Sequence, residues 1–361
     1  MLETYNETKM VMLPTGDMFI GEVYIMKLQY RIKNDHIEIL RCYGTDSRIT
    51  IPEEIDGKPV TSMAAYAFSV HGNEEKEALV WETEEFFAGE EDRFLAGEEV
   101  EEIILPETVR EIGRYIFYGC KKLRRLEISD DLMQVGTGAF TGCSGLEELV
   151  IHQKKGMKSC VKEILGELWQ KIDVDFLYES GEAAGKRAHM VFPEHYDEAV
   201  ENTPARILFT EYHGSGTNYR QCFYNKELDF AEYDSLFDMA VVMDKLEVLV
   251  DMSFGRIRYP WQLSEKAKKQ YEDYIRGKLK DIGEYLVESG NLNGLELLSR
   301  EKLWNREGVE HSIDVASRKK DMEISAFLMN ERSRMMEEEQ KSTSETESSG
   351  QSIKKRKKFQ L

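Results

Sequence analysis

The residues best suited to chemistry lie between positions 190 and 260. His195 or His213 could serve as the base of a nucleophilic Cys222, because an imidazole can remove the proton of a thiol. Such a pair needs a lowered thiol pKa and an oriented base, and the spacing fixes neither. Cys222 stands in the pattern Tyr219-x-x-Cys222-Phe223-Tyr224, which is typical of an apolar helix face in a core. We therefore predict no catalytic residue, and an enzyme in residues 190–260 stays an alternative.

A glycine-rich segment, His213-Gly214-Ser215-Gly216-Thr217, precedes a predicted helix. Main-chain amides at a helix start can bind phosphate. A phosphate-binding P-loop ends in Gly-Lys-Ser/Thr and follows a strand, and this segment has neither feature. We predict a turn here and no cofactor.

The five cysteines include no C-x-x-C pair, and their odd number argues against a disulfide framework. Zinc-ligand spacing is missing too, so we predict no metal site. Cys120 and Cys143 are 23 residues apart, at equivalent positions of two sequence units. Stacked strands lie about 4.7–4.9 Å apart, which makes a bridge between them conceivable. The alternative is the more common role of small, buried apolar residues.

The charge balance is strongly acidic. Lys and Arg number 48 against 68 Asp and Glu, a net charge of −20, which opposes non-specific attraction to nucleic acid or anionic membrane. Residues 74–102 hold thirteen acidic and two basic residues, a local net charge of −11. The run Lys354–Lys358 has the opposite sign and could contact nucleic acid, membrane phosphate, an acidic protein or the acidic segment itself. Nucleic-acid association through this tail is a second alternative function, disfavoured by the overall charge.

Residues 1–26 lack the basic start, apolar centre and cleavage site of a signal peptide. No apolar run approaches the roughly 20 residues that cross a bilayer. We expect a cytoplasmic protein without membrane insertion, although export by another route stays open.

A 23-residue unit repeats in register along the middle of the chain. The strand pattern Val100-x-x-Ile103-x-Leu105 recurs 23 and 46 residues later, and the turn pattern Gly113-x-x-x-Phe117-x-Gly119-Cys120 recurs at Gly136–Cys143. A period of about 20–29 residues with L-x-x-L-x-L strands is typical of a leucine-rich-repeat solenoid, in which neighbouring units bury each other's apolar edges. We predict that Phe68, Phe117 and Phe140 form one interior column.

The first repeats are preceded by a predicted hairpin and interrupted by an insert. Lys27–Lys33 and His36–Cys42 alternate like strands around an Asn34-Asp35 turn. About 26 extra residues, within the acidic insert 71–99, separate Phe68 from the next strand. We predict a solvated loop, with a docked amphipathic segment as the alternative because the insert also carries apolar side chains at Trp81, Phe86, Phe87, Phe94 and Leu95.

These repeats resemble the BspA type of bacterial leucine-rich repeat over about residues 27–151. The opening Ile51–Thr61 is similar to that family's first repeat, and Gly136–Cys143 resembles its central Gly-x-x-Ala-Phe-x-Gly-Cys motif. Two positions depart from the motif, with Ala64 in place of the glycine and Ile116 in place of the small alanine. The resemblance implies a curved parallel-sheet module for protein or carbohydrate recognition.

The strand positions between the core residues are predicted to face outward on the concave side, because strand side chains alternate. Stacking three strands then places nine side chains in three rows, which we call the charged strip. The strip could bind a partner, or its opposite charges could only hold neighbouring strands in register. Its rows are Glu101/Arg124/Glu147, Glu102/Arg125/Glu148 and Ile104/Glu127/Val150.

The pattern changes after residue 151. A helix capped by Ser159, with the stripe Val161, Ile164, Leu165, Leu168 and Trp169, is predicted to cover the open end of the solenoid. A hairpin is predicted from residues 172–178 and 188–192, and helices over 197–209, 229–254 and 264–288. The motif at Asn291–Leu298 is echoed at Asp321–Leu328, which faintly resembles ankyrin-type hairpins; the alternative is an unrelated helical bundle.

The predicted fold class is α+β, with a leucine-rich-repeat solenoid of short parallel strands before an α-rich domain of helical hairpins. The function predicted from it is non-enzymatic binding of an unidentified protein partner through the concave face, and the oligomeric state is not predicted. The predicted parts are an N-terminal extension (1–26), the solenoid (27–155) with its insert (71–99), a mostly helical domain with a small hairpin (156–335) and a disordered tail (336–361).

Overall fold

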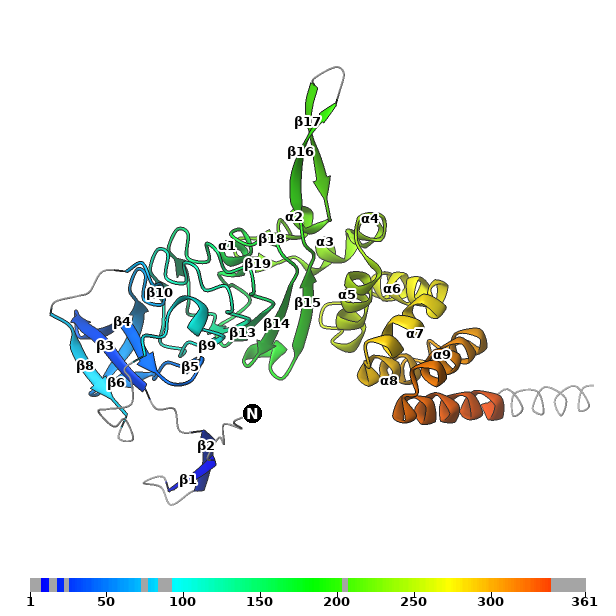
Figure 1. Ribbon diagram of the computed structural model, residues 1–361, viewed down its shortest axis with the longest axis horizontal. Helices are drawn as coiled ribbons and strands as arrows, with labels where there is room; N and C mark the ends of the chain where they lie inside the picture. The colour runs from blue at the N-terminus through cyan, green and yellow to red at the C-terminus, as the bar shows by residue number, and fades with distance from the viewer. Residues whose placement is uncertain are drawn as a thin grey trace, which may run out of the picture. The chain divides into compact units, whose positions relative to one another are not determined.

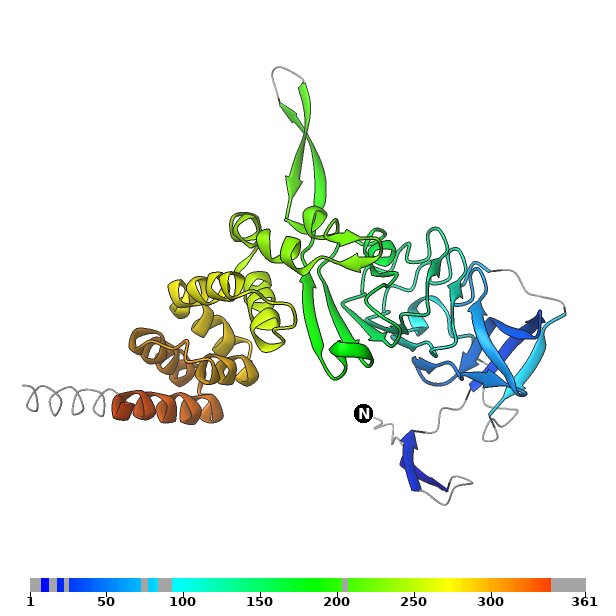
Figure 2. The same cartoon turned by 180° about the vertical axis from the view of Figure 1, so that it is seen from behind.

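The computed structural model describes residues 8–12, 18–22, 26–72, 77–83, 93–202 and 207–338. The chain forms two compact units, Met1–Asp244 and Lys245–Leu361. The division falls well after the predicted boundary at 155/156, so the first unit contains the solenoid together with the strands and helices that follow it (Figures 1 and 2).

One of the two main sheets of the first unit has the strand order β15-β14-β13-β11-β9-β5. Five of these strands run parallel, because each coil returns the chain to the same edge in the same direction. Only β15, the partner of β14, runs antiparallel. The strands are β5 (Arg48–Thr50), β9 (Glu102–Ile104), β11 (Arg125–Ser129), β13 (Glu148–Gln153), β14 (Ile172–Tyr178) and β15 (Arg187–Phe192).

A second sheet, with the order β12-β10-β7-β4-β3-β8, forms another side of the solenoid. Its β3–β4 hairpin is the predicted one, and Asn34 and Asp35 take positive φ at its turn. Met26 begins β3, so it belongs to the solenoid and not to the N-terminal extension. The strands are β3 (Met26–Lys33), β4 (His36–Gly44), β7 (Lys58–Met63) with β6 (Glu54–Ile55) beside it, β8 (Leu79–Glu82), β10 (Glu111–Ile112) and β12 (Gln134–Val135). In the extension itself, β1 (Thr8–Met12) and β2 (Met18–Glu22) pair antiparallel.

The interior column predicted from the repeat is confirmed. Phe68, Phe117 and Phe140 have no exposed surface. The ring centroids of Phe68 and Phe117 lie 5.6 Å apart, and those of Phe117 and Phe140 lie 5.3 Å apart. Each ring therefore forms the wall that its neighbour packs against.

The turns beside this column are joined by main-chain hydrogen bonds. Phe68 N donates to Ile116 O at 3.0 Å, and Phe117 N donates to Ala139 O at 3.0 Å. In the last regular coil the amides of Gly138 and Phe140 donate to the two carboxylate oxygens of Glu167, at 2.7 and 2.8 Å. The Glu167 carboxylate thus accepts the hydrogen bonds that main-chain oxygens of a further coil would otherwise accept.

The repeat glycines reflect this close stacking. A Cβ on Gly113 would lie 2.3 Å from Ala65 N, and one on Gly136 would lie 2.3 Å from Arg114 N. The first unit of the repeat carries Ala64 at the same position, and its amide donates to Ile39 O of β4 at 2.8 Å. Alanine therefore replaces the motif glycine in the first coil of the solenoid, which packs on the β3–β4 hairpin and not on an earlier coil.

Helix α1 (Val161–Leu165) follows the last regular coil, as predicted. Two details of the prediction are wrong. The N-cap is Cys160 without a side-chain bond, so Ser159 does not cap the helix, and Trp169 is 53% exposed instead of packing with the apolar stripe. The helix ends at Leu165, so Trp169 lies beyond it and outside the helical spacing on which the predicted stripe depends.

The possible Cys120–Cys143 bridge is absent, because all five cysteines are free and buried. The thiol of Cys120 donates to Phe68 O at 3.3 Å, and that of Cys143 donates to Phe117 O at 3.2 Å. Each thiol thus bonds to the preceding coil. Burial raises the pKa of Cys120 to about 12.

Part of the acidic insert docks on the solenoid, as the alternative prediction proposed. β8 adds to the edge of β3. The ring of Phe94 lies 5.5 Å from that of Tyr43, and the guanidinium of Arg41 lies 4.7 Å from the Phe94 centroid. The 3-10 turn η1 (Gly97–Glu99) then leads into β9. Phe86 and Phe87 lie outside the described residues.

The helix predicted over residues 197–209 is wrong. Strands β16 (Tyr196–Asn202) and β17 (Ile207–His213) form an antiparallel hairpin there (Figures 1 and 2). The charged run Asp197–Asn202 suits a helix, but Pro204 disfavours one, and the Ile207–Phe209 run has strand propensity. The rest of the first unit comprises η2 (Gly181–Ala183), α2 (Gly216–Tyr219), β18 (Phe223–Tyr224), β19 (Glu227–Leu228), α3 (Phe230–Ser235) and α4 (Phe237–Met243).

The second unit is helical, as predicted. Asn291, Asn305 and Asp321 each cap a following helix through a side-chain oxygen that accepts a main-chain amide. The last helix includes residues 336–338, which the prediction had assigned to the tail; residues 339–361 lie outside the described part of the chain. The helices are α5 (Leu246–Arg258), α6 (Glu265–Gly277), α7 (Leu279–Glu288), α8 (Leu292–Arg300), α9 (Arg306–Lys319) and residues 322–338.

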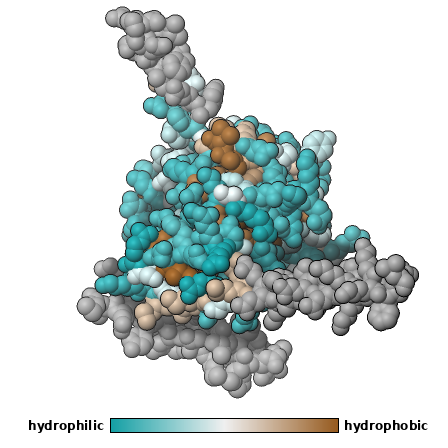
Figure 3. All heavy atoms as spheres, turned by 90° about the vertical axis from the view of Figure 1, so that its right-hand side faces the viewer, coloured by the Kyte–Doolittle hydropathy of each residue, from teal (hydrophilic) through white to brown (hydrophobic). Residues whose placement is uncertain are grey.

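Within the described ranges, no helix is both long and apolar enough to cross a membrane. The face drawn in Figure 3 is mostly hydrophilic, with small, separate hydrophobic patches.

Replacing the central ring tests the stacked column. Phe117→Ala is expected to lower the free energy of unfolding by about 3–5 kcal/mol, because it leaves a cavity between two fully buried rings. Urea denaturation followed by circular dichroism measures the change. Tyr224→Ala is the matched control, because that ring is 84% exposed and its loss should change stability by less than about 0.5 kcal/mol. Equal effects of the two substitutions would contradict the packing.

Candidate functional site: the charged strip

The structure brings the nine predicted residues of the charged strip together. In the strand register Arg125 lies between Glu102 and Glu148, and Glu127 lies between Ile104 and Val150. The amide of Arg124 donates to Glu101 O, and that of Glu147 donates to Arg124 O, at 2.7 and 2.9 Å. All three predicted rows therefore exist on neighbouring strands.

The middle of the strip is strongly paired. Arg125 lies 2.6 Å from a carboxylate oxygen of Glu127 and 3.4 Å from one of Glu148. Arg124 is held more loosely, with Glu101 and Glu102 both at 3.5 Å, and its side chain is 57% exposed. The alternative prediction, in which opposite charges hold neighbouring strands in register, therefore fits Arg125 and Glu127. Arg124 and Glu147 are exposed to solvent.

Val150 does not fit the prediction of an outward-facing side chain. It is only 4% exposed, although it lies in register between Glu127 and Asp175. Its neighbours are long or hydrogen-bonded side chains that cover a short valine. Val150 is therefore part of the packed sheet beneath the exposed charges, and it offers almost no surface to a partner.

The strip extends further than the sequence analysis predicted, because β14 continues the parallel sheet. Asp173 lies beside Glu148, and Asp175 lies beside Val150. At the other end, Arg48 and Thr50 of β5 lie beside Glu102 and Ile104. The alternation of Ile172, Val174, Phe176 and Tyr178 was visible in the sequence, but its 25-residue distance from β13 breaks the 23-residue period.

A histidine clamp, formed by His152 between Glu127 and Glu179, crosses the strip. His152 Nε2 lies 2.7 Å from Glu127, and its Nδ1 lies 2.5 Å from Glu179. Burial alone would lower the pKa of His152, but the hydrogen bonds to Glu179 and Glu127 outweigh burial and raise it. Lys154 extends the network, 3.2 Å from Glu179 and in contact with Glu107.

A second charged cluster closes the β15 side of the sheet. Asp175 is 4% exposed and accepts two hydrogen bonds from Arg187, at 2.9 and 2.8 Å, and lies 3.0 Å from His189 Nδ1. Burial alone would raise the pKa of Asp175, but the bonds from His189 and Arg187 lower it. The outer edge of β15 is bonded to a side chain, because the Tyr233 hydroxyl donates to Val191 O at 2.6 Å and accepts from Val191 N.

The residues considered for catalysis have separate surroundings. His213 stacks on Tyr196, with ring centroids 4.4 Å apart, and lies 3.2 Å from Glu198. Cys222 donates to Asn218 O at 3.7 Å, and burial raises its pKa to about 12. A thiol with a raised pKa is the opposite of an activated nucleophile.

The predicted turn is confined to Gly214 and Ser215, between the end of β17 at His213 and the start of α2 at Gly216. A strand therefore does precede the segment, unlike in the prediction. The Ser215 amide and hydroxyl both donate to the carboxylate of Asp244, which takes the place that an anion would need. A Cβ on Gly214 would lie 2.1 Å from Glu194 O, and one on Gly216 would lie 2.1 Å from Pro193 O. Close chain packing therefore explains both glycines. In the described part of the chain, no group of three or more His, Cys, Asp or Glu is arranged to hold a metal ion.

The repeat geometry agrees with the comparison to known families. A family model described as a BspA type leucine-rich-repeat region (6 copies) matches residues 90–164. This part of the chain is therefore similar to a BspA-type leucine-rich-repeat region. The match includes β9, β11, β13 and α1, and so all nine residues of the charged strip. The ankyrin-like resemblance of the last helices stays a prediction.

Two solved structures are similar to part of this chain. A leucine-rich-repeat protein of T. pallidum is 20% identical with a TM-score of 0.21, and the match covers 37% of this chain and 73% of that one. A leucine-rich-repeat protein from Bacteroides ovatus is 20% identical with a TM-score of 0.25, and the match covers 36% of this chain and 34% of that one. A comparison with curated proteins found no match.

The histidine clamp predicts a pH dependence. Since the pKa of His152 is raised on folding, its contribution to stability is fully present below its unfolded pKa of about 6.5 and is lost as the pH rises through the folded pKa. We expect the His152 side-chain NMR resonances to titrate with a midpoint above about 6.5. Glu179→Gln should lower this midpoint, because one of the two carboxylate partners is removed.

His195 is the internal control for this titration. Burial and the charge of Arg220 lower its pKa, so its midpoint should lie below about 6.5 and should not respond to Glu179→Gln. A His152 midpoint that is unchanged by the substitution would contradict the clamp.

Proposed function

We propose that the charged strip is a non-enzymatic binding surface for a protein partner. The observation that carries the proposal is the exposure of Arg124 and Glu147 beside Arg125, which is already paired to Glu127 and Glu148. Paired charges hold the sheet, while loosely held charges lose little when a partner replaces their present contacts. The BspA-type repeat region supports an interaction module of this kind.

The charge of the strip indicates the kind of partner. Five glutamates and two arginines among its nine residues give the strip a net charge of −3. A protein surface with excess positive charge would be attracted to this face, most strongly at low salt. A carbohydrate ligand fits less well, because the nine residues include no aromatic ring for a sugar to pack on.

The other functional alternatives have weaker support. The raised thiol pKa of Cys222 and the separate surroundings of His213 disfavour an enzyme built on these two residues. The basic run Lys354–Lys358 lies outside the described residues, so nucleic-acid association stays a prediction from sequence. The cytoplasmic location also stays a prediction.

Substitution of the loosely held charges tests the strip. The double variant Arg124→Ala/Glu147→Ala should weaken binding of a partner recovered by crosslinking from lysate by at least about tenfold, if these side chains are contact centres. Arg125 and Glu127 are poorer targets, since their loss would also disturb the sheet. Affinity for the purified partner is measured by titration calorimetry at two salt concentrations.

Lys121→Ala/Lys122→Ala is the matched control, because these two exposed charges precede the same strand but lie outside the strip. A partner that binds both double variants with wild-type affinity would overturn the proposal for this face.

A further inference from the structure

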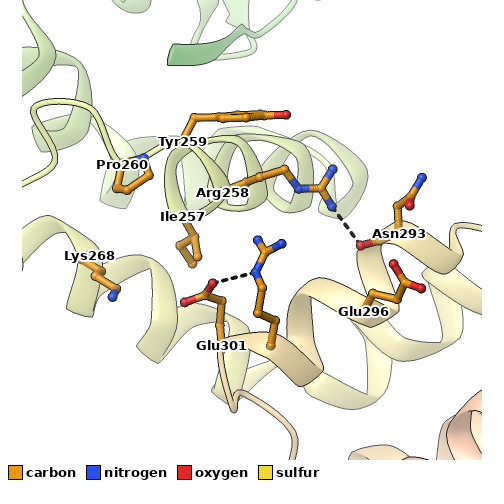
Figure 4. A pocket seen from close by; sticks show the side chains of 9 residues that line it. Ile257, Arg258, Tyr259, Pro260, Lys268, Asn293, Glu296 and Glu301 are labelled. Carbon is orange, nitrogen blue, oxygen red and sulfur yellow. Dashed lines mark hydrogen bonds and ion pairs between the residues drawn. The ribbon is translucent and has the colours of Figure 1, made fainter. Parts of the chain in front are cut away.

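The helical unit contains a polar cavity of about 540 Å³. It lies where the end of α5, the first turns of α6 and the helix α8 meet (Figure 4). This volume is within the range of pockets that hold small molecules. The polar side chains that line it belong to Arg258, Lys268, Asn293, Glu296, Arg300 and Glu301.

Three cationic side chains line this cavity in a chain whose net charge is −20. Arg300 bonds to the adjacent Glu301 at 3.1 Å, and both lie near the surface. Lys268 lies 3.8 Å from Glu272 one turn along its own helix, a distance too long for a strong pair. Lys268 is therefore weakly held, whereas Arg300 shares its charge with a solvent-exposed pair.

Arg258 is the best-positioned of the three. Its Nη2 donates to the main-chain oxygen of Asn293 at 2.8 Å, which fixes the guanidinium at the cavity (Figure 4). Its Nε is buried and has no acceptor among the residues that the structure describes. This Nε is too enclosed to reach a ligand, so a ligand oxygen would meet the guanidinium on the exposed side that bears Nη2.

Glu296 adds a negatively charged hydrogen-bond acceptor to a cavity whose other charged side chains are three cations and the Arg300 partner Glu301. Its carboxylate is exposed and pairs with no cation in the described part of the chain. It would repel a ligand that is only anionic, but it can accept hydrogen bonds from hydroxyl groups. A molecule with an anionic group at one end and hydroxyls at the other satisfies both parts of the cavity.

We propose that this cavity binds a small phosphorylated sugar. Arginine guanidinium groups match the geometry of phosphate oxygens, and Lys268 adds a point charge. The phosphate group lies toward Arg258, Arg300 and Lys268, and the sugar hydroxyls lie toward Glu296. The cavity is larger than inorganic phosphate needs, which leaves room for the sugar.

Calorimetric titration of the full-length protein with ribose 5-phosphate, inorganic phosphate and ribose tests this proposal. Ribose 5-phosphate should bind more tightly than inorganic phosphate, and ribose should show no binding. Arg300→Gln and Lys268→Gln should each weaken ribose 5-phosphate binding about tenfold, the loss expected for one charge-assisted hydrogen bond. Arg258→Gln should weaken it at least as much, and an unchanged melting temperature shows that the variant is folded.

Two further variants distinguish a built site from general attraction of anions. Lys269→Gln is the matched control, because Lys269 is adjacent to Lys268 but 74% exposed and outside the cavity; it should leave the affinity unchanged. Glu296→Ala should weaken binding of ribose 5-phosphate and not that of inorganic phosphate. Absence of ribose 5-phosphate binding, equal losses in Lys268→Gln and Lys269→Gln, or no effect of Glu296→Ala on the sugar phosphate would each overturn the proposal.

Discussion

Hydrogen bonding between the turns of successive coils is the constraint on which the first unit depends. Phe68 and Phe117 each donate their amide to the next coil and place their ring against the next ring. Such a series must end somewhere, and an uncovered last coil would expose its apolar column and leave its turn amides to water alone. Glu167 solves this problem with one carboxylate that accepts from both Gly138 and Phe140.

The same stacking determines the charged strip. Because the repeat is 23 residues long, residues 23 positions apart lie side by side on neighbouring strands. Arg125 therefore lies in register between Glu102 and Glu148. Opposite charges on neighbouring strands then support the register that the buried residues impose. The proposed binding role and the structural role therefore fall on neighbouring side chains. Arg125 is committed to internal pairs, whereas Arg124, one residue earlier, is more exposed and more loosely held.

Sequence periodicity was sufficient to predict the phenylalanine column and the three rows of the strip, because both follow directly from the repeat length. It did not predict features that depend on contacts outside the repeat. β14 joins the sheet at a spacing of 25 residues, the capping role of Glu167 has no local pattern, and the burial of Val150 depends on its neighbours. The β16–β17 hairpin was predicted as helix, because the charged run Asp197–Asn202 has helical composition and strand pairing overrides it.

Hydrogen exchange at the turn amides measures the central constraint most directly. If the coils are joined as described, the amides of Phe68 and Phe117 exchange far more slowly than exposed amides, and Glu167→Ala accelerates exchange at Gly138 and Phe140 while the two earlier phenylalanines keep their protection. Glu182→Ala, which removes an exposed carboxylate beyond the solenoid end, should change none of these rates. Rapid exchange at Phe68 and Phe117 in the unaltered protein, or no change at Gly138 and Phe140 in Glu167→Ala, would contradict the account.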